Sequence, residues 1–311
     1  MIVTGGAGFI GSNFINYWLS GHKDDSIINI DKLTYAANPD NVRHKEFGGR
    51  YRLIKGDITD SSFISKTVKD SDVIVNFAAE SHVDNSIASP AQFLTSNYMG
   101  VFSLLESARK YDIRFHQIST DEVYGSLPLN SPEMFNENSK YNPKNPYSAT
   151  KAAADFLVNS YINTYGIRAT ISNCSNNFGP YQHTEKLIPK SISLALKNEK
   201  IPLYGNGEQV RDWIYVEDHC SAVESVLERG KIGETYLVSS RNEQRNIDVV
   251  KKILLILGKP QDLIYFTSDR PGHDVRYSIN PEKLEKSTGW KPSFSFDKAL
   301  ELTVKMYTKH A

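Results

Sequence analysis

Cysteine is scarce in this sequence of 311 residues, which contains only Cys174 and Cys220. Their separation matches no metal-binding spacing, and so few thiols are typical of a protein from a reducing compartment. We therefore expect both cysteines to be small buried hydrophobic residues. His82 and His273 have no partner at a metal-ligand spacing either, so the sequence predicts no metal ion.

A net charge is also absent, because 36 Lys and Arg residues balance 36 Asp and Glu residues. This balance predicts neither a nucleic-acid surface nor a polybasic membrane patch. No apolar run approaches the length of a membrane span. Residues 1–4 already have the pattern of a strand, which leaves no room for a signal peptide. We therefore expect a soluble, cytoplasmic protein without nucleic-acid or membrane partners.

The first half of the chain alternates between strand and helix patterns, and its length suffices for a large α/β domain. Short apolar or β-branched runs predict strands at 27–30, 51–54, 73–77, 115–119 and 169–172. Helical spacing of apolar residues lies between several of them, most clearly at 13–20 and 91–110. Such alternation predicts βαβ units and a parallel sheet. The expected fold class is α/β, a Rossmann-type doubly wound parallel sheet with a smaller C-terminal lobe.

After about residue 174 the alternation loosens. The sequence predicts a loop at 176–181, a helix at 186–197, a strand and turn at 203–207, strands at 213–216 and 235–238, and a helix at 246–257. We see no internal repeat, low-complexity tract or flexible linker. We expect residues 1–174 to form the sheet domain, with about 211–240 returning to it, and residues 175–311 to form mainly a second lobe.

Glycines follow the first predicted strand and precede a helix. Gly5, Gly8 and Gly11 have the spacing G-x-x-G-x-x-G, which lets backbone N–H groups approach a pyrophosphate at the helix N-terminus. The next strand ends in Asp31, whose carboxylate would accept hydrogen bonds from both ribose hydroxyls and repel a 2′-phosphate. The pattern therefore favours NAD over NADP. The alternative is a glycine-rich loop in which Asp31 only caps a turn.

Further candidates follow the later strands, because open α/β sheets bind ligands at the carboxyl ends of their strands. Asp57 could contact the adenine, or it could instead cap the helix expected at 61–69. Residues 78–81 would line the path of the dinucleotide.

Two polar clusters carry the chemistry. Tyr147 and Lys151 are four residues apart on a predicted helix, so they share a face, and Lys151 would lower the pKa of the phenol. The stretch 119–125 places Asp121 beside Glu122 directly after a predicted strand. A simple dehydrogenase needs one proton acceptor, so the additional acids predict an oxidation coupled to an elimination. The alternatives are a solvated acidic turn and a Tyr147 ring packed on the core.

The glycine motif and the Tyr147/Lys151 pair together resemble the extended short-chain dehydrogenase/reductase family. Within it, the chain is most similar to nucleotide-sugar 4,6-dehydratases, in particular those that act on dTDP-glucose. The likeness runs nearly from end to end, through 4–12, 31–36, 78–84, 119–125, 173–177, 185–189, 211–213 and 270–274. Epimerases of this family usually have small residues in place of Asp121 and Glu122. Related decarboxylases and GDP-mannose dehydratases keep the Glu and typically replace the Asp, so the acidic pair discriminates among them.

The resemblance implies conversion of dTDP-glucose to its 4-keto-6-deoxy product, a step of dTDP-rhamnose-type nucleotide-sugar biosynthesis. Tyr147, supported by Lys151, would take the proton of the C4 hydroxyl, and Thr120 would hold the C4 oxygen. Glu122 would remove the C5 proton, and Asp121 would protonate the departing C6 hydroxyl. Two adjacent enclosed carboxylates should titrate as a coupled pair, with one protonated at neutral pH.

The resemblance also implies binding residues and a homodimer formed through the helices at 91–110 and 147–165. Those implied for NAD are Gly5, Gly8, Phe9, Ile10, Gly11, Asp31, Lys32, Leu33, Thr34, Asp57, Ile58, Ala78, Ala79, Ser81, Ser96, Tyr147, Lys151 and Asn177. Those implied for the nucleotide sugar are Ser81, Thr120, Asn176, Glu185, Lys186, Leu187, Pro202, Tyr204, Arg211, Asn246, Arg270, His273 and Tyr277. Arg211 and Arg270 are the candidates for the diphosphate, because a planar guanidinium matches phosphate geometry.

Small departures from the family pattern bear on the base of the nucleotide. Ser96 replaces the usual Thr, Phe178 replaces a Tyr, and Asn85 and 38–40 also resemble UDP-glucose 4,6-dehydratases. One methyl group in an apolar pocket discriminates by only about 1–3 kcal/mol, so uridine remains an alternative to thymidine. A UDP-sugar 4-epimerase, a UDP-xylose-forming decarboxylase and a non-catalytic NAD-sensing scaffold are further alternatives. A scaffold, however, would not need all five proposed catalytic residues.

Overall fold

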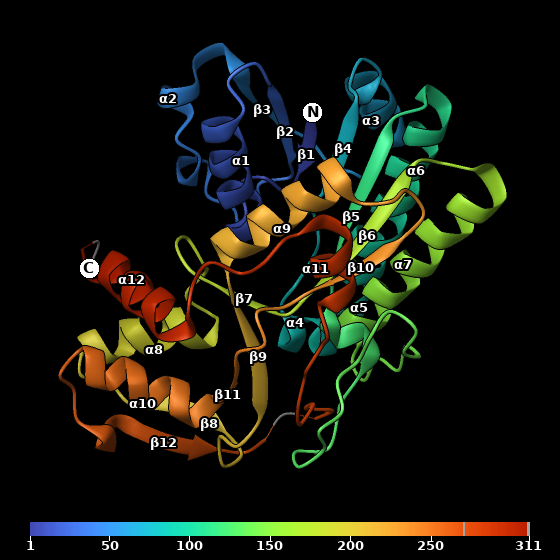
Figure 1. Cartoon of the computed structure of the whole chain (residues 1–311). Helices are drawn as coiled ribbons and strands as arrows, with labels where there is room; N and C mark the ends of the chain where they lie inside the picture. The colour runs from blue at the N-terminus through green and yellow to red at the C-terminus, as the bar shows by residue number, and fades with distance from the viewer. Residues whose placement is uncertain (270, 310–311) are drawn as a thin grey trace.

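The computed structural model describes residues 1–269 and 271–309, and a seven-stranded parallel sheet forms its centre (Figure 1). The strand order is β10-β6-β5-β4-β1-β2-β3. These strands are β1 (Ile2–Thr4), β2 (Ile27–Asp31), β3 (Tyr51–Lys55), β4 (Val73–Asn76), β5 (Arg114–Thr120), β6 (Ala169–Cys174) and β10 (Thr235–Val238). The order reverses beside β1, which confirms the predicted doubly wound fold and places a ligand-binding crevice at the carboxyl ends of β1 and β4.

Helices cover both faces of this sheet. One layer contains α1 (Phe9–Gly21) and α9 (Val216–Arg229), and the other contains α3 (Ser61–Val68), α6 (Gly100–Tyr111) and α7 (Pro146–Tyr165). Successive residues of a strand point to opposite faces, so Val3 packs in the first layer and Ile2 in the second. The sheet is therefore buried on both sides, which fixes the positions of its strand ends.

The helix predicted at 91–110 is interrupted. The structure contains α5 (Pro90–Phe93), then a π-helical segment (η3, Leu94–Met99), then α6. A π turn shifts the hydrogen bond to i→i+5 and so moves later residues around the axis. The 3.6-residue periodicity of apolar side chains could not reveal this π-helical segment. The segment places Ser96 in the lining of the cleft at the carboxyl ends of the strands.

The second lobe contains two small sheets (Figure 1). One has the order β11-β9-β7 and the other pairs β12 with β8. The strands are β7 (Asn176–Phe178), β8 (Ile201–Tyr204), β9 (Val210–Tyr215), β11 (Glu243–Arg245) and β12 (Ile264–Thr267), and the main helices are α8 (Leu187–Leu196), α10 (Asn246–Ile256) and α12 (Phe296–Lys309). The loop predicted at 176–181 is wrong for residues 176–178, which pair in parallel with β9. Two successive asparagines concealed that strand, because Asn is depleted in strands.

Shorter elements complete the chain. They are the α-helices α2 (His44–Phe47), α4 (Val83–Ala88) and α11 (Glu282–Thr288), and the 3₁₀ turns η1 (Pro39–Asn41), η2 (Gly48–Arg50), η4 (Asp121–Tyr124) and η5 (Gln261–Leu263). Both cysteines are buried and free, as expected. Within residues 1–269 and 271–309, no helix has the length and apolar character needed to cross a bilayer.

Candidate active site

A cleft of about 320 Å³ lies at the carboxyl ends of the central strands. All five residues predicted for catalysis line it. The described lining residues also include every residue predicted to bind the cofactor except Leu33. The doubly wound topology thus brings together side chains that lie far apart in the sequence.

The glycine turn lies between β1 and α1. Gly5 has a φ of +70°, and a Cβ at this position would lie 2.6 Å from the backbone N of Ala78. A Cβ on Gly11 would lie 2.4 Å from Gly5 O, so neither position tolerates a side chain. Helix α1 starts after Gly8, which has no side chain to cap it, and its first residues line the cleft. Its first N–H groups are therefore suited to bind a pyrophosphate.

Asp31 ends β2 at the edge of the cleft. Its Oδ2 accepts a hydrogen bond from Ala7 N (2.9 Å), and its Oδ1 accepts one from Leu33 N (2.8 Å). Burial raises the pKa of Asp31, and these two N–H donors oppose the shift. Leu33 thus supports the carboxylate through its backbone, with a φ of 58°. Asp31 both orders its turn and lines the cleft, so its role in the turn is compatible with the ribose contact predicted from the sequence.

Asp57 also lines the cleft. Its Oδ2 lies 2.8 Å from Lys32 Nζ, and its Oδ1 accepts a hydrogen bond from Thr59 N. The alternative role as the cap of α3 is wrong, because Asp60 accepts from the N–H groups of Ser62 and Phe63. The Lys32–Asp57 pair therefore lies in the lining of the cleft, where a bound ligand could contact it.

Tyr147 and Lys151 lie in the first turns of α7. The helix starts with a capping box between Asn145 and Ser148, which fixes the position of its first turn. Lys151 is 5% exposed, and its Nζ donates to Ile118 O at 2.6 Å. Burial lowers the pKa of Lys151, whereas the charge of Asp155 raises it.

The protein's own groups hold the pKa of Tyr147 well above its usual range. Burial is the largest cause, the charge of Glu122 adds to it, and a hydrogen bond with Thr120 opposes it. The expected lowering of the phenol pKa requires the positive charge of the oxidised cofactor as well as Lys151, and the protein's own groups alone do not produce it. The ammonium group is instead hydrogen-bonded to the carbonyl of Ile118.

The acidic pair lies in η4, directly after β5. Asp121 is 2% exposed, so the alternative of a solvated acidic turn is wrong. Thr120 Oγ1 donates to Asp121 Oδ1 (3.2 Å), and Asn145 Nδ2 donates to Glu122 Oε2 (3.5 Å). Burial and then the charge of Glu122 raise the pKa of Asp121 well above its usual range. Burial and the neighbouring carboxylate therefore both favour the protonated form of Asp121.

A buried polar network lies behind these residues, and sequence reasoning missed it. Asp155 Oδ2 accepts from Ser119 Oγ (2.7 Å), Tyr141 OH (3.2 Å) and Asn173 Nδ2 (3.1 Å). Burial raises the pKa of Asp155 to about 6, and the charge of Lys151 opposes this. The available signal was a carboxylate four residues after Lys151, hence on the same face of α7.

The residues predicted for the nucleotide sugar divide into two groups. Ser81, Thr120, Asn176, Glu185 and Lys186 line the cleft, and Lys186 Nζ donates to Ser81 O at 3.0 Å. The described lining does not include Leu187, Pro202, Tyr204, Arg211, Asn246, His273 and Tyr277. Arg270 lies outside the described residues. The cleft also contains Ala36, which lies in the family-like stretch 31–36, and Ala37, Gln182 and His183, for which the sequence offered no signal.

Arg211 is 6% exposed and is already engaged by the protein. Its guanidinium donates to Val210 O (2.8 Å) and Asp274 O (2.9 Å), and it lies over the ring of Tyr277 at 4.3 Å. These contacts position β9 against the segment that contains Asp274. They do not support the predicted diphosphate contact in this structure.

Known proteins resemble the chain over almost its whole length. A family model described as GDP-mannose 4,6 dehydratase matches residues 2–303. The chain is 48% identical to a dTDP-glucose 4,6-dehydratase of Mycobacterium tuberculosis, over 99% of this chain and 92% of the relative. It is 49% identical to the low-salt glycan biosynthesis protein Agl12 of Haloferax volcanii, over 99% and 98%.

A solved structure shows the same likeness. The dTDP-glucose 4,6-dehydratase DesIV of Streptomyces venezuelae, with NAD and TYD bound, has a TM-score of 0.96 and 40% identity, and the match covers 99% of this chain and 96% of that one. The resemblance inferred from the motifs is thereby confirmed. The chain belongs to the GDP-mannose 4,6 dehydratase family.

Proposed function

We propose that this chain is an NAD-dependent dTDP-glucose 4,6-dehydratase, a hydro-lyase of dTDP-rhamnose-type nucleotide-sugar biosynthesis. The observation that carries the proposal is the convergence of Asp121, Glu122, Tyr147 and Lys151 on the cleft that begins at the glycine turn. The relative from Mycobacterium tuberculosis has this activity in its name, and the solved relative from Streptomyces venezuelae has NAD bound.

The residues present fit NAD. The uncapped start of α1 would bind the pyrophosphate, and the crowded positions Gly5 and Gly11 let the backbone approach it closely. Asp31 would accept from the ribose hydroxyls and exclude a 2′-phosphate. The pair of Lys32 and Asp57 would border the adenine. Bound there, NAD would supply the hydride acceptor for oxidation at C4 and the hydride donor for C6, so there would be no net consumption of cofactor.

The side chains would move the protons. Tyr147 takes the proton of the C4 hydroxyl, aided by Lys151 and the cofactor's positive charge, and Thr120 holds the C4 oxygen. The resulting C4 ketone acidifies the C5 proton, which Glu122 removes as general base. Protonated Asp121 donates to the C6 hydroxyl, which leaves as water. Glu122 then returns its proton to C5.

The sugar nucleotide would extend from this point toward the second lobe. Ser81 and Asn176 border the hexose, and Glu185 and Lys186 lie at the same cleft. We assign Lys186 as a cation for the diphosphate, because its ammonium is partly exposed and held by Ser81 O. We assign Arg211 the role of positioning β9. On this account residues 1–174, with α9 and β10, bind NAD, and most of 175–311 binds the nucleotide.

We also propose a cytoplasmic homodimer. Large apolar side chains are exposed on η3, α6 and α7: Leu94 (55%), Met99 (49%), Phe102 (37%), Phe156 (60%) and Tyr165 (53%). A second copy covering this surface would pack against the helix that contains Tyr147 and Lys151. The two free cysteines suit a reducing cytoplasm.

Product mass tests the proposed activity. We expect incubation with dTDP-glucose to give a product lighter by one water, with the alkali absorbance of a 4-keto sugar. A parallel incubation with UDP-glucose tests the base, and we expect a lower rate there. An unchanged mass would indicate epimerisation, and turnover of a uronic acid with loss of carbon dioxide would indicate decarboxylation; either result would contradict the proposal.

A further inference from the structure

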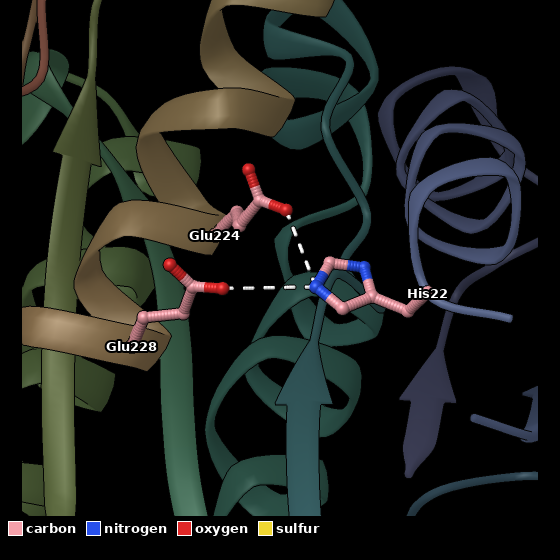
Figure 2. Close-up of side chains that lie close together, drawn as sticks. All are labelled: His22, Glu224 and Glu228. Atoms are coloured by element: carbon pink, nitrogen blue, oxygen red, sulfur yellow. Dashed lines mark ion pairs between the residues drawn. The ribbon is translucent and has the colours of Figure 1, made fainter. Parts of the chain in front are cut away.

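Three potential metal ligands converge outside the cleft, between α1 and α9 (Figure 2). His22 directly follows α1, and Glu224 and Glu228 are one turn apart on α9. His22 Nε2 lies 3.4 Å from Glu224 Oε1 and 3.6 Å from Glu228 Oε1. The ligand atoms of the three residues lie within 4.8 Å of one another. The two packed helices thus aim one imidazole and two carboxylates at a common point.

The orientation of the His22 ring leaves a lone pair on Nε2. Nδ1 lies 3.1 Å from the carbonyl O of Trp18, which can only accept, so Nδ1 carries the hydrogen in the neutral ring. The ring also stacks on Trp18, with centroids 4.0 Å apart and planes 11° apart. A histidine that donates one ring N–H to a carbonyl and presents the other nitrogen is the usual form of a metal ligand.

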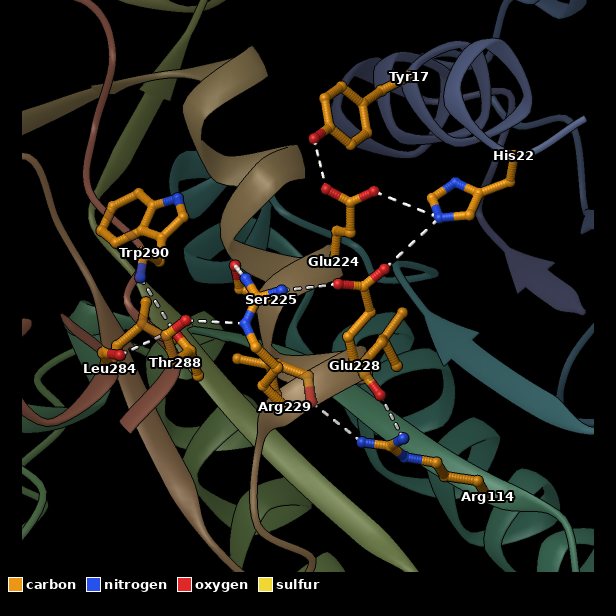
Figure 3. Close-up of polar contacts among 12 residues, drawn as sticks. Tyr17, His22, Arg114, Glu224, Ser225, Glu228, Arg229, Leu284, Thr288 and Trp290 are labelled. Atoms are coloured by element: carbon orange, nitrogen blue, oxygen red, sulfur yellow. Dashed lines mark hydrogen bonds and ion pairs between the residues drawn. The ribbon is translucent and has the colours of Figure 1, made fainter. Parts of the chain in front are cut away.

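Each glutamate is also held in place by its second oxygen (Figure 3). Tyr17 OH donates to Glu224 Oε2 at 2.6 Å, and Arg229 Nη1 donates to Glu228 Oε2 at 2.8 Å. The Oε1 atoms therefore face His22 Nε2, so the neutral ring and the two carboxylates present three ligand atoms to one point.

We infer that His22, Glu224 and Glu228 bind a divalent transition-metal ion of the zinc type. One imidazole and two carboxylates match the ligand sets of zinc, and water would complete a tetrahedron. Magnesium and calcium prefer oxygen ligands alone, so the imidazole disfavours them. The ion would join the C-terminal end of α1 to α9. The sequence predicted no metal because the histidine and the glutamates are far apart in the chain.

Zinc titration of tag-free protein tests the inference. We expect isothermal titration calorimetry to show one zinc ion per chain and no comparable binding of magnesium. His22→Gln, Glu224→Gln and Glu228→Gln should each weaken zinc binding by at least about tenfold, because loss of even a supporting residue commonly has that effect. Unchanged affinity in these variants would overturn the inference. Absence of zinc binding by the wild-type protein would also overturn it.

A matched control comes from the lining of the cleft, where His183 Nδ1 lies 3.6 Å from Glu185 Oε2. His183→Gln removes a similar histidine–glutamate pair and should leave zinc affinity unchanged. If this substitution abolished binding, the zinc would lie in the cleft and the inference would be wrong. Amide hydrogen exchange of the wild-type protein gives a second test that needs no variant. Zinc should slow exchange at the C-terminal ends of α1 and α9. Slowing confined to other elements would also overturn the inference.

Discussion

Asp121 and Glu122 are adjacent in the chain but have different surroundings. Asp121 is almost completely buried, whereas Glu122 is partly exposed and contacts Asn145. Since burial disfavours a charge, these surroundings fit the proposed acid role of Asp121 and the proposed base role of Glu122. In a solvated turn, an Asp and a Glu would have similar surroundings and could not take separate acid and base roles in this way.

Isosteric substitutions test these two roles. Asp121→Asn removes the acidic proton and Glu122→Gln removes the base, so each should lower kcat by roughly 10²–10⁴-fold, the usual contribution of general acid–base catalysis. Steady-state assays of 4-keto sugar formation measure the effect. Asp297→Asn, an exposed change on α12, is the control. Normal dehydration by both active-site variants would remove the proposed roles.

Asp212 on β9 makes stability depend on pH. It is fully buried and accepts hydrogen bonds from Ser239 Oγ and Asn242 N, and burial raises its pKa from 3.8 to about 6. Between these values the folded state binds more protons than the unfolded state, so stability falls as pH rises. Complete ionisation of Asp212 lowers the free energy of unfolding by up to about 3 kcal/mol, and the decrease between pH 5 and 7.5 is about 1 kcal/mol.

Guanidinium unfolding at pH 5 and pH 7.5 checks this sign. Asp212→Asn cannot ionise, so this variant should lose about 1 kcal/mol less stability than the wild type over that range. An equal loss of stability between pH 5 and pH 7.5 in the wild type and in Asp212→Asn would show that the pKa of Asp212 is not raised. The exposed variant Asp297→Asn should follow the wild type.

Residues with a local pattern were predictable, and residues whose role depends on packing were not. The glycines, Asp31, Tyr147 and Lys151 have fixed spacings next to recognisable strands and helices, so their place at the cleft could be expected. No local sequence pattern indicates that Arg211 is buried and donates a hydrogen bond to Asp274 O. The contacts of Asp155 come from β5, β6 and the segment around Tyr141, which only the folded sheet brings together.

At the scale of elements, α1 depends on small residues at its start. Gly11→Ala would place a Cβ 2.4 Å from Gly5 O, so the turn must open. We expect a loss of about 1–3 kcal/mol in stability, as for other overpacked sites, and weaker NAD binding. Gly21→Ala is the matched control on the same helix, because among the described residues nothing beyond its chain neighbours and the backbone of its own helix turn lies within 4 Å of the added Cβ. Chemical unfolding and NAD titration would measure both effects; equal behaviour of the two variants would contradict the close-approach argument.

The strength of the local sequence signal also determines which helices and strands can be predicted. The central strands begin or end within about a residue or two of the expected positions, because β-branched runs between turn residues are a strong signal. The strand β7 was missed because its pairing with β9, and not its composition, stabilises it. The π-helical segment before α6 was missed because helical periodicity cannot locate a single i→i+5 turn.

At the scale of the whole molecule, the exposed apolar surface of η3, α6 and α7 predicts assembly. Phe156 is 60% exposed on α7, and Phe156→Glu would place a charge in the proposed interface. We expect sedimentation velocity to show a dimer for the wild type and monomers for this variant. Leu255→Glu is the control, since Leu255 is 81% exposed on α10 in the second lobe. A monomeric wild type, or loss of the dimer only with Leu255→Glu, would exclude this interface.

The path of one hydrogen tests the central claim most directly. In the proposed reaction, the hydrogen removed from C4 reappears at C6 of the same sugar after water has left. We predict that dTDP-glucose deuterated at C4 gives a 4-keto-6-deoxy product with deuterium in its C6 methyl group. A product that has deuterium at C4, or that contains none, would contradict the account.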